Sequence, residues 1–534
     1  MPQSRTPLLR ALQDAFRKSL TPEGEEPDGA AAASAPAPRP GDYDRRRFLL
    51  DALKAGTLVG AAGALWPVEA VAQLRGTQPV IAIVGGGLAG LNAAYQLKKA
   101  GLAATVYEAG AAPGGRIHTA RDLLGQGLTT EVGGEFVDSS HADVLTLIAE
   151  FGLPRFDTLA LTERRLVRDD YFINGRRYTE REVVNAFRPF ARRIRRANDA
   201  LPEDSYGDSP RAVALDRLSI EEYLNRLGVR GWFRDLLDVA FTSEFGLDTG
   251  QQSALNFITM IGTDTSQGKF QIFGDSDERF KISGGNDTLI RELARRLEGG
   301  VKTGHKLHAL SESGGGYSLN FGDRGEVRAD YVILAVPFTI LRQVELRVAL
   351  PPRKKLAIEQ LGYGTNSKLL LGFRERTWRS QGYSGYLFND VVQNGWDNSQ
   401  MQLGNRGVGG YTVYLGGTAG VNLDADKRSD YLSALDGAYP GARAQFNDRH
   451  RVVRWHKYEL VQGSYACYKV GQWSTISGVE GEPVGNLFFA GEHCSGDFQG
   501  YMNGAAETGR TAAEAIIRKV VAPARRRPAR RRAR

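Results

Sequence analysis

Cysteine is scarce in this chain of 534 residues, which has only Cys467 and Cys494. So few cysteines exclude a disulfide framework and the paired spacings of a structural zinc site. The seven histidines are scattered and form no metal-ligand pattern such as HExxH. We therefore predict that the protein holds no metal. No Ser–His–Asp or paired-carboxylate arrangement is visible that would indicate a hydrolase.

Positive charge is concentrated in one short segment. The formal net charge is +8, and the C-terminal stretch "RRRPARRRAR" holds seven arginines and no acid. The rest of the chain is nearly neutral, so nothing indicates binding to nucleic acid. We predict that residues 521–534 form a basic disordered tail.

A long hydrophobic run is missing as well. The apolar stretch at residues 56–68 is about 13 residues long, which is too short to cross a bilayer as a helix. We predict no transmembrane span. Residues 1–42, which become rich in alanine, proline and acid, are predicted to be a disordered arm.

The short apolar stretch has the neighbours of an export signal. Arg45 and Arg46 precede it, Phe48 and Leu49 follow them, and the small-residue pattern "AVA" comes after it. Residues 43–73 therefore resemble a twin-arginine signal. We predict export by the twin-arginine machinery, to the periplasm or outside the cell. The alternative is a short amphipathic helix in a disordered arm, with a cytoplasmic protein.

Glycine, by contrast, is abundant, and three glycines have a spacing that binds nucleotides. Gly85, Gly87 and Gly90 form G-x-G-x-x-G between a predicted strand at 80–84 and a helical pattern, and a second predicted strand is closed by Glu108. The glycines let the backbone approach a pyrophosphate, the helix N-terminus offers free N–H groups, and the acid accepts ribose hydroxyls. This combination favours FAD or NAD over NADP.

The next segment separates FAD from NAD. "GAAPGGRIHT" places Gly114, Gly115 and Arg116 where they can cover the pyrophosphate, with the arginine neutralising it. Here the sequence resembles the flavin-containing amine oxidase family, which includes monoamine oxidases, polyamine oxidases and L-amino acid oxidases. The resemblance extends over residues 78–520. It implies FAD as the cofactor and an α/β fold with a Rossmann-like FAD-binding domain.

Two later segments resemble further cofactor motifs of the family. In "VKTGHKLHAL", the resemblance implies that Val301 contacts the adenine. In "GNLFFAGEHCSGDFQGYMNGAAETGRTAAEAII", it makes Gly491, Glu492 and Met502 cofactor-binding residues. Glu492 would bind the phosphate–ribose region. The helix that begins near Asn503 would direct its N-terminus at N1 and C2=O of the flavin.

The resemblance also implies three catalytic side chains. Lys368, in "GYGTNSKLLLGF", stands where the family has a lysine that holds a water against flavin N5. Tyr465 and Tyr501 stand where monoamine oxidases have two facing aromatics that orient the amine. From the residues alone, Lys368 also fits an edge-strand surface lysine, and the tyrosines fit core aromatics. Ser464 stands where covalent members have the flavin-linking cysteine, so we predict non-covalent FAD.

The implied reaction is hydride transfer from the carbon next to an amine to flavin N5. Water hydrolyses the imine, and oxygen reoxidises the flavin to give hydrogen peroxide. We therefore predict an oxidoreductase whose partners are a small-molecule amine and O2. A flavin desaturase acting on a non-amine and a non-catalytic FAD-binding protein remain as alternatives. A homodimer is compatible with the sequence, which does not itself give the oligomeric state.

The stretch "TTEVGGEFVDSSH" bears on the substrate. L-amino acid oxidases have a carboxylate-binding arginine at the position of Phe136, whereas monoamine oxidases have an aromatic there. Polyamine oxidases have an acid at the position of Asp138. We predict an amine substrate, with Asp138 as the candidate to hold a second cationic group. An oxidase of basic amino acids is the alternative, with an arginine from residues 164–196 as the carboxylate clamp.

Strand alternation predicts the directions of these side chains. If residues 131–138 form one strand, Phe136 and Asp138 share the face toward the pocket, and Glu131 lies on the other face as scaffold. Glu135 is expected beside Glu131 unless the strand bends at the glycines. Asp138 alternatively caps the helix that begins after it.

Two interleaved domains are predicted, because 534 residues exceed one hydrophobic core. Segments 78–155, 286–336 and 456–520 would form the FAD-binding domain, and segments 156–285 and 337–455 an α+β substrate domain. The first substrate segment has a helical pattern, and the second has strand patterns such as "KLLLGF" and "GGYTVYLGG".

Overall fold

A computed structural model describes residues 78–202, 205–266, 268–404 and 406–524 of the protein. The predicted arm 1–42, the export signal 43–73 and most of the predicted tail lie outside these residues. The last helix, α18 (Met502–Ala524), extends into the first four residues of the predicted tail. Within the described ranges, no helix is both long and apolar enough to span a bilayer.

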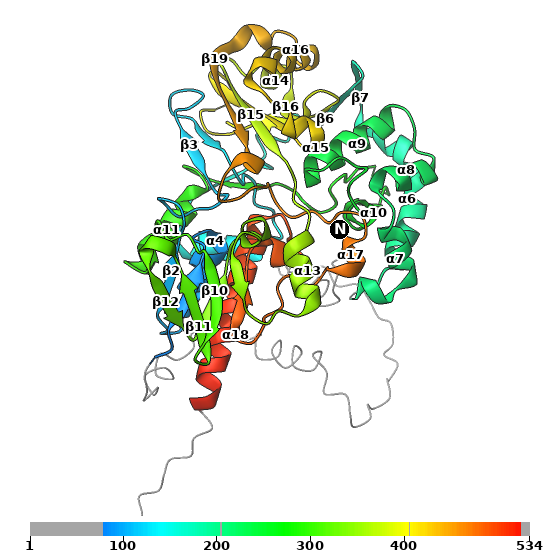
Figure 1. The fold of residues 1–534 in the computed structure, drawn as a ribbon. Helices are drawn as coiled ribbons and strands as arrows, with labels where there is room; N and C mark the ends of the chain where they lie inside the picture. Colours follow the sequence, from blue (N-terminus) through cyan, green and yellow to red (C-terminus); the bar gives the residue numbers. More distant parts are fainter. Residues whose placement is uncertain (1–77, 203–204, 267, 405, 525–534) are drawn as a thin grey trace, which may run out of the picture. The chain divides into compact units, whose positions relative to one another are not determined.

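A five-stranded parallel sheet carries the glycine motif (Figure 1). In spatial order its strands are β20 (Leu487–Phe489), β13 (Tyr331–Leu334), β1 (Ile81–Val84), β2 (Ala104–Tyr107) and β9 (Val301–Lys302). All four neighbouring pairs are parallel. These strands come from all three segments expected to bind FAD. The predicted α/β fold with a Rossmann-like sheet is thus confirmed.

The sequence explains the first β-α-β unit. Strand β1 reads IAIV and is buried along its whole length, as expected for a parallel strand covered on both faces. Helix α4 (Leu88–Lys99) buries most of its apolar side chains and ends in two lysines, which suit the negative end of the helix dipole. Gly101 follows with φ +79°, a left-handed conformation that returns the chain to β2 at little steric cost.

A four-stranded sheet follows, with the order β12 (Glu326–Ala329), β11 (Gly316–Asn320), β10 (Ala309–Ser313) and β14 (Glu345–Arg347). Strand β14 lies beyond residue 336, where the FAD-binding segment was expected to end. It pairs in parallel with β10. This small sheet therefore crosses the predicted boundary.

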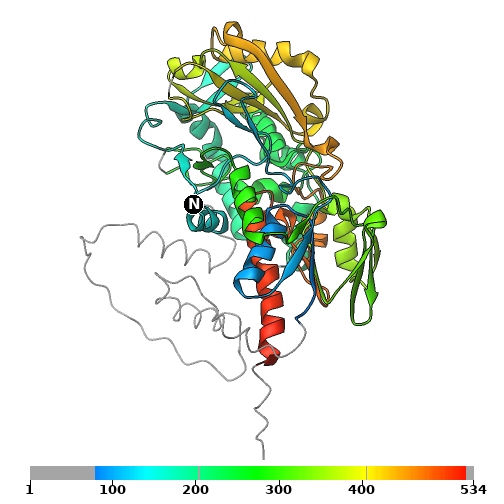
Figure 2. The same ribbon diagram turned by 90° about the vertical axis from the view of Figure 1, so that its left-hand side faces the viewer.

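A seven-stranded sheet and the five-stranded sheet lie at opposite ends of the described part of the structure, as both views show (Figures 1 and 2). Its order is β19 (Phe446–Arg454), β15 (Ser367–Phe373), β18 (Gly409–Leu415), β17 (Gln393–Asp397), β16 (Tyr383–Asn389), β6 (Val167–Ile173) and β7 (Arg176–Tyr178). Strands β15 and β18 are the predicted "KLLLGF" and "GGYTVYLGG" segments.

Strands β6 and β7 contradict the helical pattern expected for the whole first substrate segment. β6 reads VRDDYFI, in which charged residues hide the strand alternation. Asp170 in β6 is buried because Arg177 in β7 binds it, with Arg177 Nε 2.8 Å from Asp170 Oδ1. The ion pair that stabilises the buried charge joins β6 to β7. Neither strand alone therefore reveals in its sequence that Asp170 can be buried.

Five α-helices follow β7 in the described part of the first substrate segment, in agreement with its helical pattern: α6 (Glu180–Asp199), α7 (Pro210–Asp216), α8 (Ile220–Leu227), α9 (Trp232–Phe245) and α10 (Ala254–Met260). Capping boxes at Thr179 and Ser219 begin α6 and α8. The remaining α-helices are α5 (Ala142–Glu150), α11 (Asp287–Leu297), α12 (Phe338–Leu341), α13 (Pro352–Gln360), α14 (Thr377–Ser380), α15 (Gly417–Val421), α16 (Arg428–Ala438) and α17 (Gln472–Thr475).

Two short antiparallel pairs and a shared core join these parts. The pairs are β3 (Thr119–Arg121) with β4 (Thr129–Glu131), and β5 (Arg155–Asp157) with β8 (Phe280–Ile282). One cluster of buried apolar residues runs from β1 through α6 and α9, and includes Val84, Phe187 and Phe241. The interleaved segments therefore fold against one another.

Gly90 is expected to be intolerant of any side chain. A Cβ on Gly90 would lie 2.0 Å from the Gly85 carbonyl oxygen, so the turn between β1 and α4 would have to open. We expect Gly90→Ala to lower the free energy of unfolding by about 1–3 kcal/mol, measured by denaturant titration. Gly87→Ala is the control, because a Cβ there meets nothing within 4 Å. Equal effects of the two changes would contradict the steric explanation.

Candidate active site

A cavity of about 600 Å³ brings most of the predicted site residues together. Residues at the glycine turn border it, as do Lys368 of β15, Trp396 of β17 and Tyr414 of β18 from the seven-stranded sheet. The predicted site residues that line it are Gly85, Gly87, Glu108, Gly114, Gly115, Arg116, Phe136, Asp138, Lys368, Tyr465, Gly491, Glu492, Tyr501 and Met502.

Two predicted residues are not part of the lining. Gly90 packs against the glycine turn, which is a structural role. Val301 pairs with Val106 at the edge of the five-stranded sheet, whereas His305 and Leu307 line the cavity. The contact of Val301 with the adenine stays a prediction.

The N-terminus of α4 opens into the cavity. Gly87 is its N-cap, no side chain caps it, and its first turn has no acid. The absence of a Cβ at Gly87 leaves open space beside these free N–H groups, which is the environment that phosphate requires. Gly114 and Gly115 have φ of +143° and +57° and bring the next segment over the same space. These residues fit a pyrophosphate.

Glu108 is fixed at the end of β2. Its two carboxylate oxygens accept hydrogen bonds from the backbone N–H groups of Gly86 and Gly110, both at 2.6 Å. A carboxylate has further lone pairs, so Glu108 can also accept from ribose hydroxyls. A fixed acceptor at this position fits the ribose hydroxyls of a dinucleotide such as FAD.

Arg116 and Glu492 form an ion pair at the cavity wall. Arg116 Nη1 lies 2.7 Å from Glu492 Oε1, and Glu492 Oε2 accepts from the Gly500 N–H at 2.9 Å. Arg116 keeps other guanidinium N–H groups that can neutralise a phosphate. Glu492 fixes the backbone just before α18 begins at Met502. The N-terminus of α18 is thereby held at the cavity.

The segment after β4 corrects the prediction of one strand over residues 131–138. β4 ends at Glu131, and the chain then bends past the Arg116 backbone. A Cβ on Gly133 would lie 1.9 Å from the Arg116 carbonyl oxygen. Beyond the bend, strand alternation no longer holds, and Glu135, Phe136 and Asp138 all line the cavity. Glu131 accepts from the Thr119 hydroxyl at 2.8 Å, as expected of scaffold.

Asp138 is a cavity residue and not a helix cap. Helix α5 has His141 as its N-cap, with no side-chain capping bond. His141 Nδ1 accepts from the Asp138 N–H at 3.0 Å, and its Nε2 lies 3.4 Å from Asp138 Oδ2. Burial lowers the pKa of His141 to about 3. His141 is therefore neutral, and its tautomer directs the Nε2 proton toward Asp138.

Three carboxylates share one region of the cavity lining: Asp138, Glu244 and Glu278, here called the acidic wall. Burial raises the pKa of Asp138 to about 7, of Glu244 to about 7 and of Glu278 to about 8. Repulsion from Asp138 adds to the shifts of Glu244 and Glu278. The acidic wall is thus a site where a cation would be stabilised and protons displaced.

Glu244 connects the two predicted tyrosines. The Tyr465 hydroxyl donates to the Glu244 carbonyl oxygen and lies 3.0 Å from the Tyr414 hydroxyl. The Tyr501 hydroxyl donates to Glu244 Oε1 at 3.2 Å. Both tyrosines line the cavity, so they are not merely core aromatics.

Glu244 and Glu278 were not among the residues predicted from the sequence. Glu244 lies in the last turn of α9, where the helix dipole disfavours a carboxylate; this misplaced charge was a usable signal. Glu278 lies in an irregular segment and has φ +42°, an unusual value for a non-glycine residue. Only the structure could identify its role, because its place at the cavity follows from contacts far away in the sequence.

Lys368 is 3% exposed, which excludes the surface-lysine alternative. Its Nζ donates to the carbonyl oxygens of Glu131 and Gly133 at 3.1 and 2.9 Å, and to Glu135 Oε2 at 3.0 Å. The lysine therefore lies at the cavity wall with its charge compensated. Among the described residues, no group of histidine, cysteine or acidic side chains is arranged to hold a metal ion.

Comparison with known proteins identifies the family. The family model for flavin containing amine oxidoreductases matches residues 88–517. The chain belongs to this family. Flavin is therefore its cofactor, and the residues described above fit FAD.

This chain is similar, over most of its length, to curated relatives and to solved structures. It is 23% identical over 458 residues to the flavin-containing amine oxidase of Danio rerio, covering 82% of this chain and 85% of that one. Amine oxidase A of Equus caballus is 23% identical over 465 residues, with 84% and 86% covered.

Two solved structures share the fold. Cyclohexylamine oxidase from Brevibacterium oxydans IH-35A matches with a TM-score of 0.74 at 21% identity, over 83% of this chain and 100% of that one. Putrescine oxidase with putrescine bound matches with a TM-score of 0.70 at 22% identity, over 83% and 99%.

The acidic wall should make stability depend on pH. The pKa of Glu244 rises from 4.5 to about 7 on folding, so the folded state holds the proton more tightly than the unfolded state. Stability is then lost as pH rises from about 4.5 through about 7. We expect Glu244→Gln to raise the melting temperature of the apoprotein by a few degrees at alkaline pH and to leave it unchanged at acid pH.

The exposed Glu359→Gln on α13 controls for the loss of one negative charge. A Glu244→Gln stabilisation of the same size at acid and alkaline pH would contradict the protonation argument.

Proposed function

We propose that the protein is an FAD-dependent amine oxidase that binds FAD without a covalent bond. When bound, FAD accepts a hydride at N5 from the carbon next to the amine and passes the electrons to oxygen, giving hydrogen peroxide, while water hydrolyses the imine to a carbonyl compound. The observation that carries the proposal is that one cavity joins the glycine turn, the two tyrosines and the acidic wall.

The acidic wall supports a substrate with a second cationic group. Its three carboxylates hold protons near neutral pH because they are buried together. A substrate ammonium would replace those protons and restore the charged form. The similarity to putrescine oxidase adds support, because putrescine is a diamine.

The tyrosines support oxidation of the amine in its neutral form. Tyr465 and Tyr501 are both anchored to Glu244 through their hydroxyl groups, so their rings are held in place. An amine between such rings is removed from water, which lowers its pKa and frees its lone pair. The opposite end of the substrate can remain charged against the acidic wall.

Non-covalent binding of FAD is supported by the cysteines. Ser464 lines the cavity and donates its hydroxyl to Asn366 Oδ1 at 2.6 Å. Neither Cys467 nor Cys494 is a lining residue, and burial raises the pKa of both thiols. A thiolate able to attack the flavin is therefore disfavoured at both positions.

An oxidase of basic amino acids is the second candidate, because a second cavity adjoins the first. It has a volume of about 500 Å³ and shares Phe136, Glu278 and Trp396 with the first cavity. Arg164, Arg168 and Lys269 also line it and could bind a carboxylate. Phe136 itself occupies the position of the arginine clamp of L-amino acid oxidases.

Peroxide release from putrescine, butylamine and L-lysine distinguishes the candidates. We expect putrescine to have a kcat/KM at least about tenfold above that of butylamine, since a compensated cation is worth at least about 1.4 kcal/mol. A preference for L-lysine would favour the second candidate. Absence of peroxide and of flavin reduction with every amine in a broad panel would contradict the proposal.

Asp138→Asn is expected to act on the diamine selectively. Removing this charge should raise KM for putrescine about tenfold and change KM for butylamine less than about twofold. In the wild type, KM for putrescine should fall as pH rises through about 7 to 8, because the acidic wall must lose protons to bind a cation. Steady-state peroxide assays at several pH values measure both effects.

Asp277→Asn is the matched control for this variant. Asp277 accepts from the Ser139 N–H at 2.9 Å and is not a lining residue of the cavity. Equal changes in KM for both substrates in Asp138→Asn would exclude a role in holding the second cation.

Export by the twin-arginine machinery is proposed from the leader sequence. We expect a variant with Arg45→Lys and Arg46→Lys to accumulate inside the cytoplasm, as measured by cell fractionation and immunoblotting. If the variant and the wild-type protein are distributed equally between the cell fractions, the two arginines do not direct export, and the alternative of a cytoplasmic protein is favoured.

A further inference from the structure

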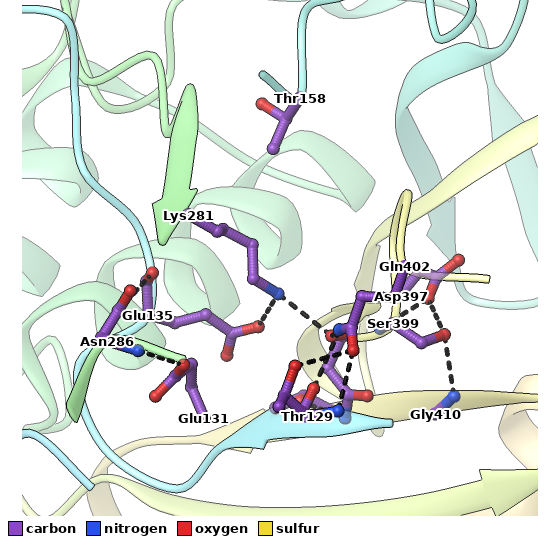
Figure 3. Close-up of polar contacts among 12 residues, drawn as sticks. Thr129, Glu131, Glu135, Thr158, Lys281, Asn286, Asp397, Ser399, Gln402 and Gly410 are labelled. Atoms are coloured by element: carbon purple, nitrogen blue, oxygen red, sulfur yellow. Dashed lines mark hydrogen bonds and ion pairs between the residues drawn. The ribbon is translucent and has the colours of Figure 1, made fainter. Parts of the chain in front are cut away.

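One carboxylate at the cavity wall is held between two buried lysines. Glu135 Oε1 accepts from Lys281 Nζ at 2.8 Å, a contact that Figure 3 shows, and Glu135 Oε2 accepts from Lys368 Nζ at 3.0 Å. Each of the three residues is at most 5% exposed. They come from the bend after β4, from β8 and from β15. The sequence assigned no role to Lys281, which lies 87 positions before Lys368.

The position of Lys368 depends on this carboxylate. An ammonium group has three N–H donors, and those of Lys368 are accounted for by Glu135 and by the carbonyl oxygens of Glu131 and Gly133. Lys368 can hold a water only by releasing one of these partners. Glu135 is the only charged acceptor among the three, so it is the partner that both fixes and compensates this lysine.

Lys281 is held differently. Its Nζ donates to Glu135 and to the Asn398 carbonyl oxygen at 3.0 Å. It is not a lining residue of the cavity, whereas Glu135 and Lys368 are. Lys281 therefore acts on the cavity through Glu135 and makes no direct contact with its contents.

The three side chains together carry one net positive charge. Burial alone would raise the pKa of Glu135, but the charges of Lys281 and Lys368 lower it, so the carboxylate is ionised. Glu131, the other acid nearby, has its pKa raised by burial to about 7. Below about pH 7, Glu131 is mostly protonated and does not cancel the net charge.

We propose that Glu135 is a positioning residue that holds the Lys368 ammonium at the flavin-binding cavity, and that Lys281 supplies the charge that keeps this lysine–glutamate–lysine group net positive. Without Lys281, Glu135 would neutralise Lys368. A positive charge beside the flavin stabilises its reduced, anionic form and a negatively charged oxygen intermediate. The inference rests on the proposed function in one respect, which is that the flavin lies beside Lys368.

The midpoint potential of the bound flavin tests the proposal in the holoenzyme. Lys281→Met leaves a neutral Glu135–Lys368 pair and should lower the potential and slow reoxidation of the dithionite-reduced flavin by oxygen about tenfold. Glu135→Gln removes the negative charge, but its amide oxygen can still accept from Lys368 and hold it in place, so this variant should not lower the potential. The double variant, Glu135→Gln with Lys281→Met, leaves Lys368 as one positive charge and should return the potential toward the wild-type value.

Lys354→Met is the matched control. Lys354 is 2% exposed and donates to the Glu480 carbonyl oxygen at 2.8 Å, but it does not line the cavity. Its loss should reduce the melting temperature and leave the potential of the flavin unchanged.

The direction in which each variant changes the flavin potential distinguishes a positioning role of Glu135 and Lys281 from a merely structural one. If Lys281→Met lowers only the melting temperature, or if Glu135→Gln lowers the potential as much as Lys281→Met does, the proposal is overturned. If Lys281→Met does not fold with FAD, Lys368→Met, which leaves the neutral Glu135–Lys281 pair, must lower the potential. Dithionite reduces the flavin without an amine, so these results are independent of whether any amine is a substrate.

Discussion

The ion pairs of Glu135 with Lys281 and Lys368 are the interaction on which the site depends most. A buried charge costs several kcal/mol unless a partner compensates it. Three separate elements must therefore meet at one point: the bend after β4, strand β8 and strand β15. Strand β15 lies in the seven-stranded sheet, and β8 precedes α11. The ion pairs thus hold the seven-stranded sheet, through β15, against the bend after β4 and against β8.

Charge of opposite sign is separated within the same cavity. The lysine–glutamate–lysine group is net positive, whereas Asp138, Glu244 and Glu278 form a region that favours cations. An amine placed beside Lys368 is more easily kept neutral, because a nearby positive charge disfavours the ammonium form. An amine at the acidic wall is kept charged. Under the proposed function, this separation would orient a diamine, with its neutral end reacting and its charged end held.

The local parts of this arrangement were predictable, and the long-range parts were not. Gly85, Gly87 and Glu108 belong to one continuous β-α-β pattern whose geometry follows from adjacent residues. The direction of the Glu135 side chain depends on the close approach of Gly133 to the Arg116 backbone. Strand alternation in the sequence does not predict this approach. Lys281 and Glu278 lie about 140 residues or more from their partners Glu135 and Asp138. Their roles therefore exist only after folding.

The acidic wall also shows that stability and binding conflict in this cavity. Its carboxylates are desolvated and repel one another, which raises their pKa values toward and above neutrality. Apolar or amide side chains at these positions would not incur this cost. The strained backbone at Glu278, with φ +42°, adds a further cost at the same place. A cationic ligand that displaces the protons of these carboxyl groups would relieve the electrostatic part of this cost, because the ligand's charge would favour their ionised form.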